Sequence, residues 1–239
     1  SYSIFKVIKE ECNLKALNIK FMLGHSLGEY TALACSNKIN LATCAKLLKV
    51  RGELMDKAIE PNKSGMAALI GLSNDEVQNI INKNKLDLQI ANDNSKVQIV
   101  VSGMIDKIKD SEKFFLKNGV KKFIKLNVSS AFHSDLMLKA QSELKKYIEK
   151  INFFTTDIGI VSNFNAKINN DNNTIKECLS KQMANKVRWT ESIKELANMN
   201  EKKLIEIGPG KVLSGLVKRI DSNVKLIQIN NIEDLKNLI

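Results

Sequence analysis

The sequence predicts an α/β protein in which a larger unit with a parallel sheet carries a smaller inserted unit. Helix and strand patterns alternate along most of the chain, which favours parallel strands covered by helices on both faces. One segment departs from that alternation and has the order β-α-β-β-α-β. A chain of 239 residues, 44% of them hydrophobic, is long enough for one large domain that carries a smaller one.

The first part of the chain predicts three helices around one short buried strand. Apolar residues with helical spacing form one stripe on the longest helix, at Leu41, Ala45, Leu48 and Leu54. The expected helices span 7–17, 31–38 and 41–58, and the expected strand spans 20–23. The sequence Glu60-Pro61-Asn62 then breaks the pattern.

The segment from 63 to 127 predicts the inserted unit. Its β-α-β-β-α-β order is that of the split β-α-β or ferredoxin-like fold, and its length suits a small subdomain. The strands are expected at 66–72, 86–92, 97–102 and 121–126, and the helices at 75–84 and 105–118.

The remaining residues, 128–239, return to alternation and complete the larger unit together with 1–62. No internal repeat is visible, and no linker separates independent domains. The expected helices span 135–150, 174–185, 191–198 and 212–220, the strands span 158–162, 203–207 and 225–229, and an Asn-rich loop spans 165–173.

The chain is basic, with a net charge of +11. Lys and Asn are heavily used while Pro and aromatic residues are scarce, as in A/T-rich genomes, so codon bias explains the charge as well as a function does. The functional alternative is attraction to an acidic partner or a phosphate-bearing substrate. Nucleic acid is not expected, because the sequence has no recognisable binding motif and no basic stretch interleaved with aromatic residues.

Neither a membrane span nor a secretory signal is expected. No apolar run approaches the ~20 residues that a spanning helix needs, and no signal is visible at Ser1. The four cysteines form no C-x-x-C pair, and Cys35 and Cys44 lie within apolar helical patterns. We therefore expect buried thiols and a reducing compartment.

The sequence Gly24-His25-Ser26-Leu27-Gly28 predicts a nucleophilic serine. It lies between the strand at 20–23 and a helix, the context in which a tight turn lifts a serine hydroxyl out of a sheet. The glycines avoid clashes in the crowded turn, and the Leu27 N–H faces the place where an oxyanion would form. The alternative is a chance match, since Gly and Ser are common.

The candidate general base is His133. The chain has two histidines, and the other, His25, lies inside the serine motif itself. His133 lies in a loop between the last strand of the inserted unit and a helix, from which a side chain can reach back to a catalytic centre. The alternative is a surface or helix-capping histidine.

Arg51 is the candidate substrate-binding residue. The chain has three arginines, Arg51, Arg188 and Arg219, among 37 basic residues. A retained Arg can indicate a need for a planar two-pronged donor, and such a donor near a serine pocket predicts a substrate with a free carboxylate. A surface ion pair with Glu53 is an equally good explanation.

Several segments in register with these residues resemble the malonyl-CoA:acyl carrier protein transacylases and the acyltransferase domains of polyketide synthases. Residues 24–30 match the family's Gly-His-Ser-Leu-Gly-Glu-Tyr signature. The other matching segments are 50–52, 132–134, 181–183, 187–189 and 205–213. They follow one another from about residue 19 to residue 220, so the resemblance covers most of the chain.

The resemblance implies a role for each matched residue. Ser26 would be the nucleophile and His133 the base, with a carbonyl of Gln182 orienting the imidazole in place of an Asp. Arg51 would bind the malonyl carboxylate, and the Leu27 N–H would supply half of the oxyanion hole.

Three further residues match the family near its pocket. Asn92 and Asn94 belong to an Asn-x-Asn-Ser segment, and Phe132 belongs to an Ala-Phe-His sequence typical of malonyl-selective domains. A bulky Phe132 would narrow the pocket against an α-methyl group, a discrimination of only ~1–3 kcal/mol.

The resemblance also implies a reaction with two half-steps and no metal or other cofactor. Ser26 takes the malonyl group from malonyl-CoA and passes it to the phosphopantetheine thiol of acyl carrier protein. The basic surface then has a use, because acyl carrier proteins are acidic and CoA carries phosphates. We expect a monomer, in a plastid-type organelle (an apicoplast) or otherwise in the cytoplasm.

One part of the family pattern has no counterpart in this sequence. The family begins with a strand and a Gly-Gln-Gly-Ser-Gln loop whose Gln donates the other half of the oxyanion hole. We expect either that this segment is absent from the sequence or that the oxyanion hole is built differently. Two alternatives stay open: a serine hydrolase or thioesterase, and an inactive fragment that binds the carrier protein.

Overall fold

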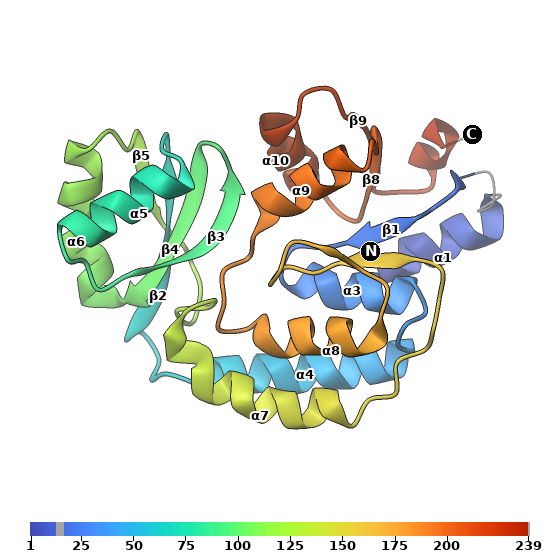
Figure 1. Cartoon of the computed structure of the whole chain (residues 1–239), viewed down its shortest axis with the longest axis horizontal. Coiled ribbons are helices and arrows are strands. Elements are labelled where there is room, and N and C mark those ends of the chain that lie inside the picture. The colour runs from blue at the N-terminus through green and yellow to red at the C-terminus, as the bar shows by residue number, and fades with distance from the viewer. Residues whose placement is uncertain (13–16, 239) are drawn as a thin grey trace.

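The computed structural model describes residues 1–12 and 17–238. Figure 1 shows two parts side by side, a small antiparallel sheet with two helices and a larger arrangement of helices around short strands. The mixture of helices and strands confirms the predicted α/β class. No helix in the described part of the chain is both long enough and apolar enough to cross a bilayer.

The chain begins with a helix and then forms the strand that leads into the serine motif. These elements are α1 (Tyr2–Glu11), β1 (Phe21–Leu23), α3 (Leu27–Cys35) and α4 (Leu41–Lys57). The helix expected at 7–17 starts and ends earlier than predicted, and the part of that prediction at 13–16 lies outside the described residues. Helix α3 begins four residues before the predicted start, because it follows the serine turn immediately.

The inserted unit has the predicted order of elements. These are β2 (Ser64–Ile70), α5 (Asn74–Lys83), β3 (Gln89–Ser95), β4 (Gln98–Met104), α6 (Ile105–Lys117) and β5 (Lys122–Lys125). The strands pair in the order β3-β4-β2-β5, with every neighbour antiparallel, as the split β-α-β fold requires. Strand β3 contacts the larger part through a parallel bridge from Asn92 to Val187. The domain boundaries at 63 and 127 stay a prediction.

The core of the inserted unit lies between one face of this sheet and the two helices. Leu69, Ile99 and Val101 on the inner strands are fully buried against Val77 of α5 and Ile108 of α6. Helix α5 starts with a capping box, in which Ser73 and Glu76 bond to each other's backbone N–H. The inserted unit is therefore stabilised by its own core and by the capping box of α5.

The rest of the chain forms the larger part. Its elements are η1 (Asp135–Met137), α7 (Leu138–Glu149), β6 (Gly159–Val161), β7 (Ile168–Asn169), α8 (Asn172–Lys181), α9 (Trp189–Asn198), β8 (Lys203–Ile207), α10 (Val212–Ile220), β9 (Lys225–Ile229) and η2 (Glu233–Asn237). Helices α3, α4, α7 and α8 share one apolar core, in which Cys44 is buried as expected. Cys35 is only half-buried, contrary to expectation, because it faces the groove described below.

The strands of the larger part pair in parallel, as predicted, but they do not form one sheet. Strand β1 pairs in parallel with β6, and β8 pairs in parallel with β9. A short strand that was not predicted, β7, lies in the Asn-rich segment and adds to β6 in the antiparallel direction. The two sheets, β1-β6-β7 and β8-β9, are not hydrogen-bonded to each other.

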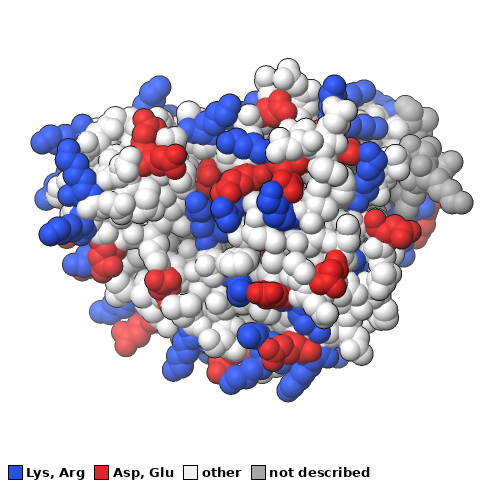
Figure 2. All heavy atoms as spheres, in the orientation of Figure 1, with Lys and Arg blue, Asp and Glu red and all other residues white. Residues whose placement is uncertain are grey.

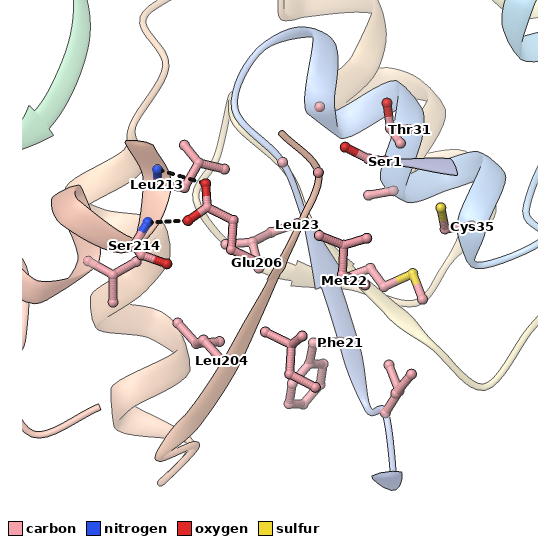
Figure 3. A pocket seen from close by; sticks show the side chains of 18 of the residues that line it. Ser1, Phe21, Met22, Leu23, Thr31, Cys35, Leu204, Glu206, Leu213 and Ser214 are labelled. Carbon is pink, nitrogen blue, oxygen red and sulfur yellow. Dashed lines mark hydrogen bonds between the residues drawn. The ribbon is translucent and has the colours of Figure 1, made fainter. Parts of the chain in front are cut away.

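An apolar groove of about 620 Å³ separates these two sheets. Figure 3 shows β1 and β8 on its opposite sides. Lys20, directly before β1, contacts Glu201, two residues before β8, at 2.6 Å, so both strands start from the same end. Side chains of both strands line the groove: Phe21, Met22, Leu23, Leu204, Ile205 and Ile207.

Charged side chains do not gather in a single basic patch on the face seen in Figure 2, where Lys and Arg are interspersed with Asp and Glu. Most of the ion pairs among the described residues join exposed side chains, and several lie within one helix, such as Lys146 with Glu143. Exposed pairs of this kind contribute little to stability.

Candidate active site

Ser26 lies on a strained turn between β1 and α3. Its φ of 50° and ψ of −103° place it in a backbone region that non-glycine residues rarely adopt. A Cβ at Gly24 would lie 2.1 Å from the carbonyl carbon of Gly28, so position 24 requires glycine. The expectation that both glycines avoid a clash is wrong for Gly28, because a Cβ added there meets nothing within 4 Å.

His133 contacts the serine hydroxyl from the loop that follows the inserted unit. The distance from His133 Nε2 to Ser26 Oγ is 2.9 Å. On the other side of the ring, Nδ1 lies 3.0 Å from the backbone oxygen of Gln182 and 3.1 Å from that of Asn185. Because carbonyl oxygens only accept, Nδ1 carries the proton and Nε2 is free to accept from Ser26.

The His133 imidazole is neutral over a wide pH range. Burial, and after it the nearby Arg51 charge, lower its pKa from the ordinary value to about 3. The hydrogen bonds to Gln182 and Asn185 oppose this shift. The surface or capping alternative does not fit a ring that is buried and bonded on both nitrogens.

Arg51 points into the same site from α4. Its Nη2 donates to Ser26 Oγ at 2.8 Å and lies 3.4 Å from the side-chain oxygen of Gln182. The guanidinium also lies 5.3 Å from the centre of the Tyr30 ring. Glu53 instead pairs with Lys49, so the suggested ion pair with Arg51 is not formed.

Arg51 is therefore a buried cation without a carboxylate partner. Only 6% of it is exposed, and the ion pairs among the described residues do not include it. Its Nε is buried without a hydrogen-bond partner in the described part of the chain. A buried charge of this kind is costly unless an anion binds to it.

Asn163 was not predicted, and it holds the serine turn in place. Its side-chain oxygen accepts from Ser26 N at 2.7 Å, and its side-chain nitrogen donates to Gly24 O at 2.8 Å. It follows β6, the parallel neighbour of β1. The rule that sites form at the carboxyl ends of parallel strands could have found it.

Leu27 occupies the first position of α3, where a backbone N–H has no partner within the helix. Its side chain is exposed. The N–H is thus placed beside Ser26 at the positive end of the helix. The expectation that a second oxyanion donor lies outside this sequence, or is built differently, stays a prediction.

The three remaining predicted residues surround this centre. Asn94 accepts a 2.7 Å hydrogen bond from His25 Nε2, and the His25 ring lies 5.6 Å from Trp189. Asn92 is buried on β3 at the bridge to the larger part, with no described bond to Ser26. Phe132 is half-buried and packs against the apolar cores of both parts.

No group of three or more His, Cys, Asp or Glu side chains in the described ranges has the arrangement of a metal site. The centre instead joins a serine hydroxyl, a neutral imidazole and a guanidinium within hydrogen-bonding distance. Such an arrangement can deprotonate the serine, attack an acyl carbon and bind a carboxylate at the same time.

Comparison with known proteins gives one family. The family model described as "Acyl transferase domain" matches residues 17–231. The malonyl CoA-acyl carrier protein transacylase of Staphylococcus aureus (strain MSSA476) is 38% identical over 229 residues, which is 93% of this chain and 73% of that protein. The polyketide biosynthesis protein PksE of Bacillus subtilis (strain 168) is 41% identical over 207 residues, 86% of this chain and 26% of that protein.

Solved structures agree with these relatives. The malonyl CoA-acyl carrier protein transacylase of Coxiella burnetii superposes with a TM-score of 0.93 at 31% identity, covering 100% of this chain and 75% of that one. A malonyl-transacylase in complex with its type II PKS acyl-carrier protein superposes with a TM-score of 0.90 at 30% identity, covering 98% and 75%.

Proposed function

This chain belongs to the acyl transferase domain family, and from that premise we propose how its residues move a malonyl group from malonyl-CoA to acyl carrier protein. One observation carries the proposal for the site. A buried Arg51 without a carboxylate partner lies at 2.8 Å from a serine that contacts a neutral histidine. The guanidinium binds the free carboxylate of the malonyl group, which an unsubstituted acyl chain does not have.

The first half-reaction loads Ser26. The Ser26 hydroxyl gives its proton to His133 Nε2 while its oxygen attacks the thioester carbon. The Leu27 N–H donates to the oxyanion that forms. When the carbon–sulfur bond breaks, His133 returns the proton to the CoA sulfur, and malonyl-Ser26 remains.

The second half-reaction unloads Ser26 onto the carrier. The phosphopantetheine thiol of acyl carrier protein gives its proton to His133, and its sulfur attacks the malonyl ester. The bond to Ser26 Oγ breaks, and His133 protonates the serine oxygen. Every proton and acyl transfer is made by groups of the chain and its two substrates, so we propose that no cofactor takes part.

Asn92, Asn94 and Phe132 complete the proposed pocket. Asn94 fixes the His25 ring beside Trp189, and the bridge at Asn92 holds the inserted unit against the larger part. Phe132 lies at the junction of the two apolar cores, one residue before the base. A monomeric state and an apicoplast-type compartment remain proposals based on the sequence.

Intact-protein mass spectrometry after a brief incubation with malonyl-CoA tests the proposed function. We expect a malonyl adduct on the wild type and on Ser129→Ala, a control that removes an exposed serine of the His133 loop. We expect none on Ser26→Ala. Added acyl carrier protein should take up the group.

The same experiment separates the alternatives. Release of malonate to water without a carrier product would indicate a hydrolase. Carrier binding without any adduct would indicate an inactive binding fragment. Acetyl-CoA tests the role of Arg51, because an acetyl group has no free carboxylate for the guanidinium to bind. Loading of acetyl at the malonyl rate would contradict that role.

A further inference from the structure

Glu29 is a buried acidic residue that the proposed reaction does not use. It lies on the first turn of α3, three residues after Ser26, and its exposed fraction is 0%. Both of its described hydrogen bonds reach one oxygen, Oε2, which accepts from Gln182 Nε2 at 2.7 Å and from Asn163 N at 3.1 Å. The other oxygen, Oε1, has no partner in the described part of the chain.

The two residues that Glu29 contacts both bond to the backbone of the serine turn. Asn163 bonds to Ser26 N at 2.7 Å and to Gly24 O at 2.8 Å. Gln182 donates from the same Nε2 to Ser26 O at 2.9 Å. Three backbone groups of the turn are therefore held by side chains of two residues that Glu29 contacts. Glu29 bonds to the side chain of Gln182 and to the backbone N–H of Asn163.

Gln182 connects this arrangement to the reacting groups. Its backbone oxygen accepts from His133 Nδ1 at 3.0 Å, and its side-chain oxygen faces Arg51 Nη2 at 3.4 Å. A rotation of the Gln182 side chain would release Ser26 O and the contact to the guanidinium at once. The 2.7 Å bond from Gln182 Nε2 to Glu29 Oε2 opposes that rotation.

We propose that Glu29 is a positioning residue of the acyl transfer, which aligns Ser26, His133 and Arg51 by holding Asn163 and Gln182. We call these three side chains, Glu29, Asn163 and Gln182, the elbow clamp. The proposal rests on Ser26 being the acylated residue of the proposed function. It predicts that hydrogen bonding at position 29, and not its negative charge, supports the reaction.

The surroundings of Glu29 agree with a role that needs no full charge. Burial raises its pKa to about 7, although the hydrogen bonds from Gln182 and Asn163 and the charge of Arg51 oppose the shift. A glutamine at this position offers the same acceptor oxygen. Glu29→Gln should keep both bonds, whereas Glu29→Ala removes them.

Rapid-quench mass spectrometry of Ser26 acylation at several malonyl-CoA concentrations tests the proposal. We expect Glu29→Ala to lower the rate at saturation by about 10- to 100-fold, because small misplacements of reacting groups have effects of that size. In Glu29→Ala, the malonyl-CoA concentration at half saturation should change by less than about threefold. The acylation rate of Glu29→Gln should stay within about threefold of the wild-type rate, since both bonds remain.

Two further variants separate positioning from stability. Glu206→Ala is the matched control, because Glu206 also accepts two hydrogen bonds, in its case from the backbone N–H groups of Leu213 and Ser214, and neither donor belongs to the clamp. It should lower thermal stability without slowing acylation. Glu29→Ala combined with Gln182→Ala should be no slower than the slower single variant, because both act through one arrangement.

A spectroscopic readout does not depend on turnover. With two histidines in the chain, ¹⁵N-histidine labelling gives two imidazole signal sets, and His133→Asn assigns them. The Nδ1–H signal of His133 should persist in Glu29→Gln and shift or broaden in Glu29→Ala. An unchanged signal in folded Glu29→Ala, wild-type acylation by Glu29→Ala, or equal losses in Glu29→Gln and Glu29→Ala would each overturn the proposal.

If the wild type forms no adduct, the proposed function fails, and the imidazole signals alone decide whether Glu29 holds the clamp. If Glu29→Ala does not fold, comparison of Glu29→Gln with Gln182→Ala decides it. We then expect the first to load Ser26 at the wild-type rate and the second to be slowed. Slowed loading by Glu29→Gln would overturn the proposal.

Discussion

The two parts of the molecule reach their structure in different ways. In the inserted unit, β2 and β4 are paired on both sides, and the ladder between them runs over seven residues. In the larger part, β1 pairs with β6 over three residues and faces a groove on its other side. Yet the reacting serine follows β1, at the end of the less completely paired sheet.

The comparison teaches that side chains, and not strand pairing alone, hold the reactive turn in the described part of the chain. Gly24 O, Ser26 N and Ser26 O are held by side chains of Asn163 and Gln182. The base arrives from the loop after the inserted unit, so the site depends on the junction of both parts.

The largest effect is expected where the two parts meet, at His133. His133→Ala should slow Ser26 acylation by about 10²–10⁴-fold, the usual contribution of a general base. The measurement is the rate of adduct formation with malonyl-CoA. A variant that loads Ser26 normally would show that His133 is not the base.

The pH dependence sharpens the same prediction. A lowered pKa keeps the imidazole neutral until the pH approaches about 3, so acylation should be nearly constant from pH 8 to pH 5. A histidine with an ordinary pKa of ~6.5 would lose roughly thirtyfold in its neutral form over that range. A fall centred near pH 6.5 would contradict the burial of His133.

The next largest effect is expected in the core of the inserted unit. Ile99→Ala removes a fully buried side chain from β4 and should lower the free energy of unfolding by about 2–5 kcal/mol. Met22→Ala on β1, whose side chain is half-buried and lines the groove, should cost less than about 2 kcal/mol. Urea unfolding of both variants measures the difference, and equal losses would contradict the contrast between the two sheets.

The smallest effect is expected at the ion pair across the groove. Lys20→Met should change the free energy of unfolding by less than about 1 kcal/mol, because the Lys20 and Glu201 side chains are 52% and 23% exposed. Urea unfolding at low and high salt measures it. Lys146→Met, which removes a pair within one helix, is the control. A loss well above that of the control would mean that the pair holds the two sheets together.

The sequence was sufficient for most elements because their patterns are local. The order of the inserted unit falls within one segment. The stripe predicted on α4 is wrong, however, because Leu41 and Ala45 are exposed. The buried face of α4 carries Cys44, Leu47, Arg51 and Met55 instead. Strand β7 was missed because it has two residues, too few for a local pattern, and its partner β6 is a separate segment of the chain. The separation of the two sheets could not be predicted either, since it depends on which strand edges meet in space.

Within the site, the sequence predicted the residue types that chemistry requires and missed the ones that hold them. Ser26, His133 and Arg51 could be proposed because few residue types can act as nucleophile, base and carboxylate binder, and the structure brings the three together. Asn163 and the Asn185 carbonyl hold the site through hydrogen bonds that depend on their position in space and not on a special residue type. Asparagine is common in this chain, and nothing in a linear pattern separates one that holds a backbone from one in a loop.

The backbone at the two reacting residues has a consequence for how this chain can evolve. Ser26 and His133 have φ values of 50° and 58°, a region that glycine enters at far lower cost. Replacing either residue by glycine would relieve this strain but would remove a side chain that the proposed reaction needs. A lineage that lost its need for acyl transfer should lose these two side chains early and become more stable by doing so.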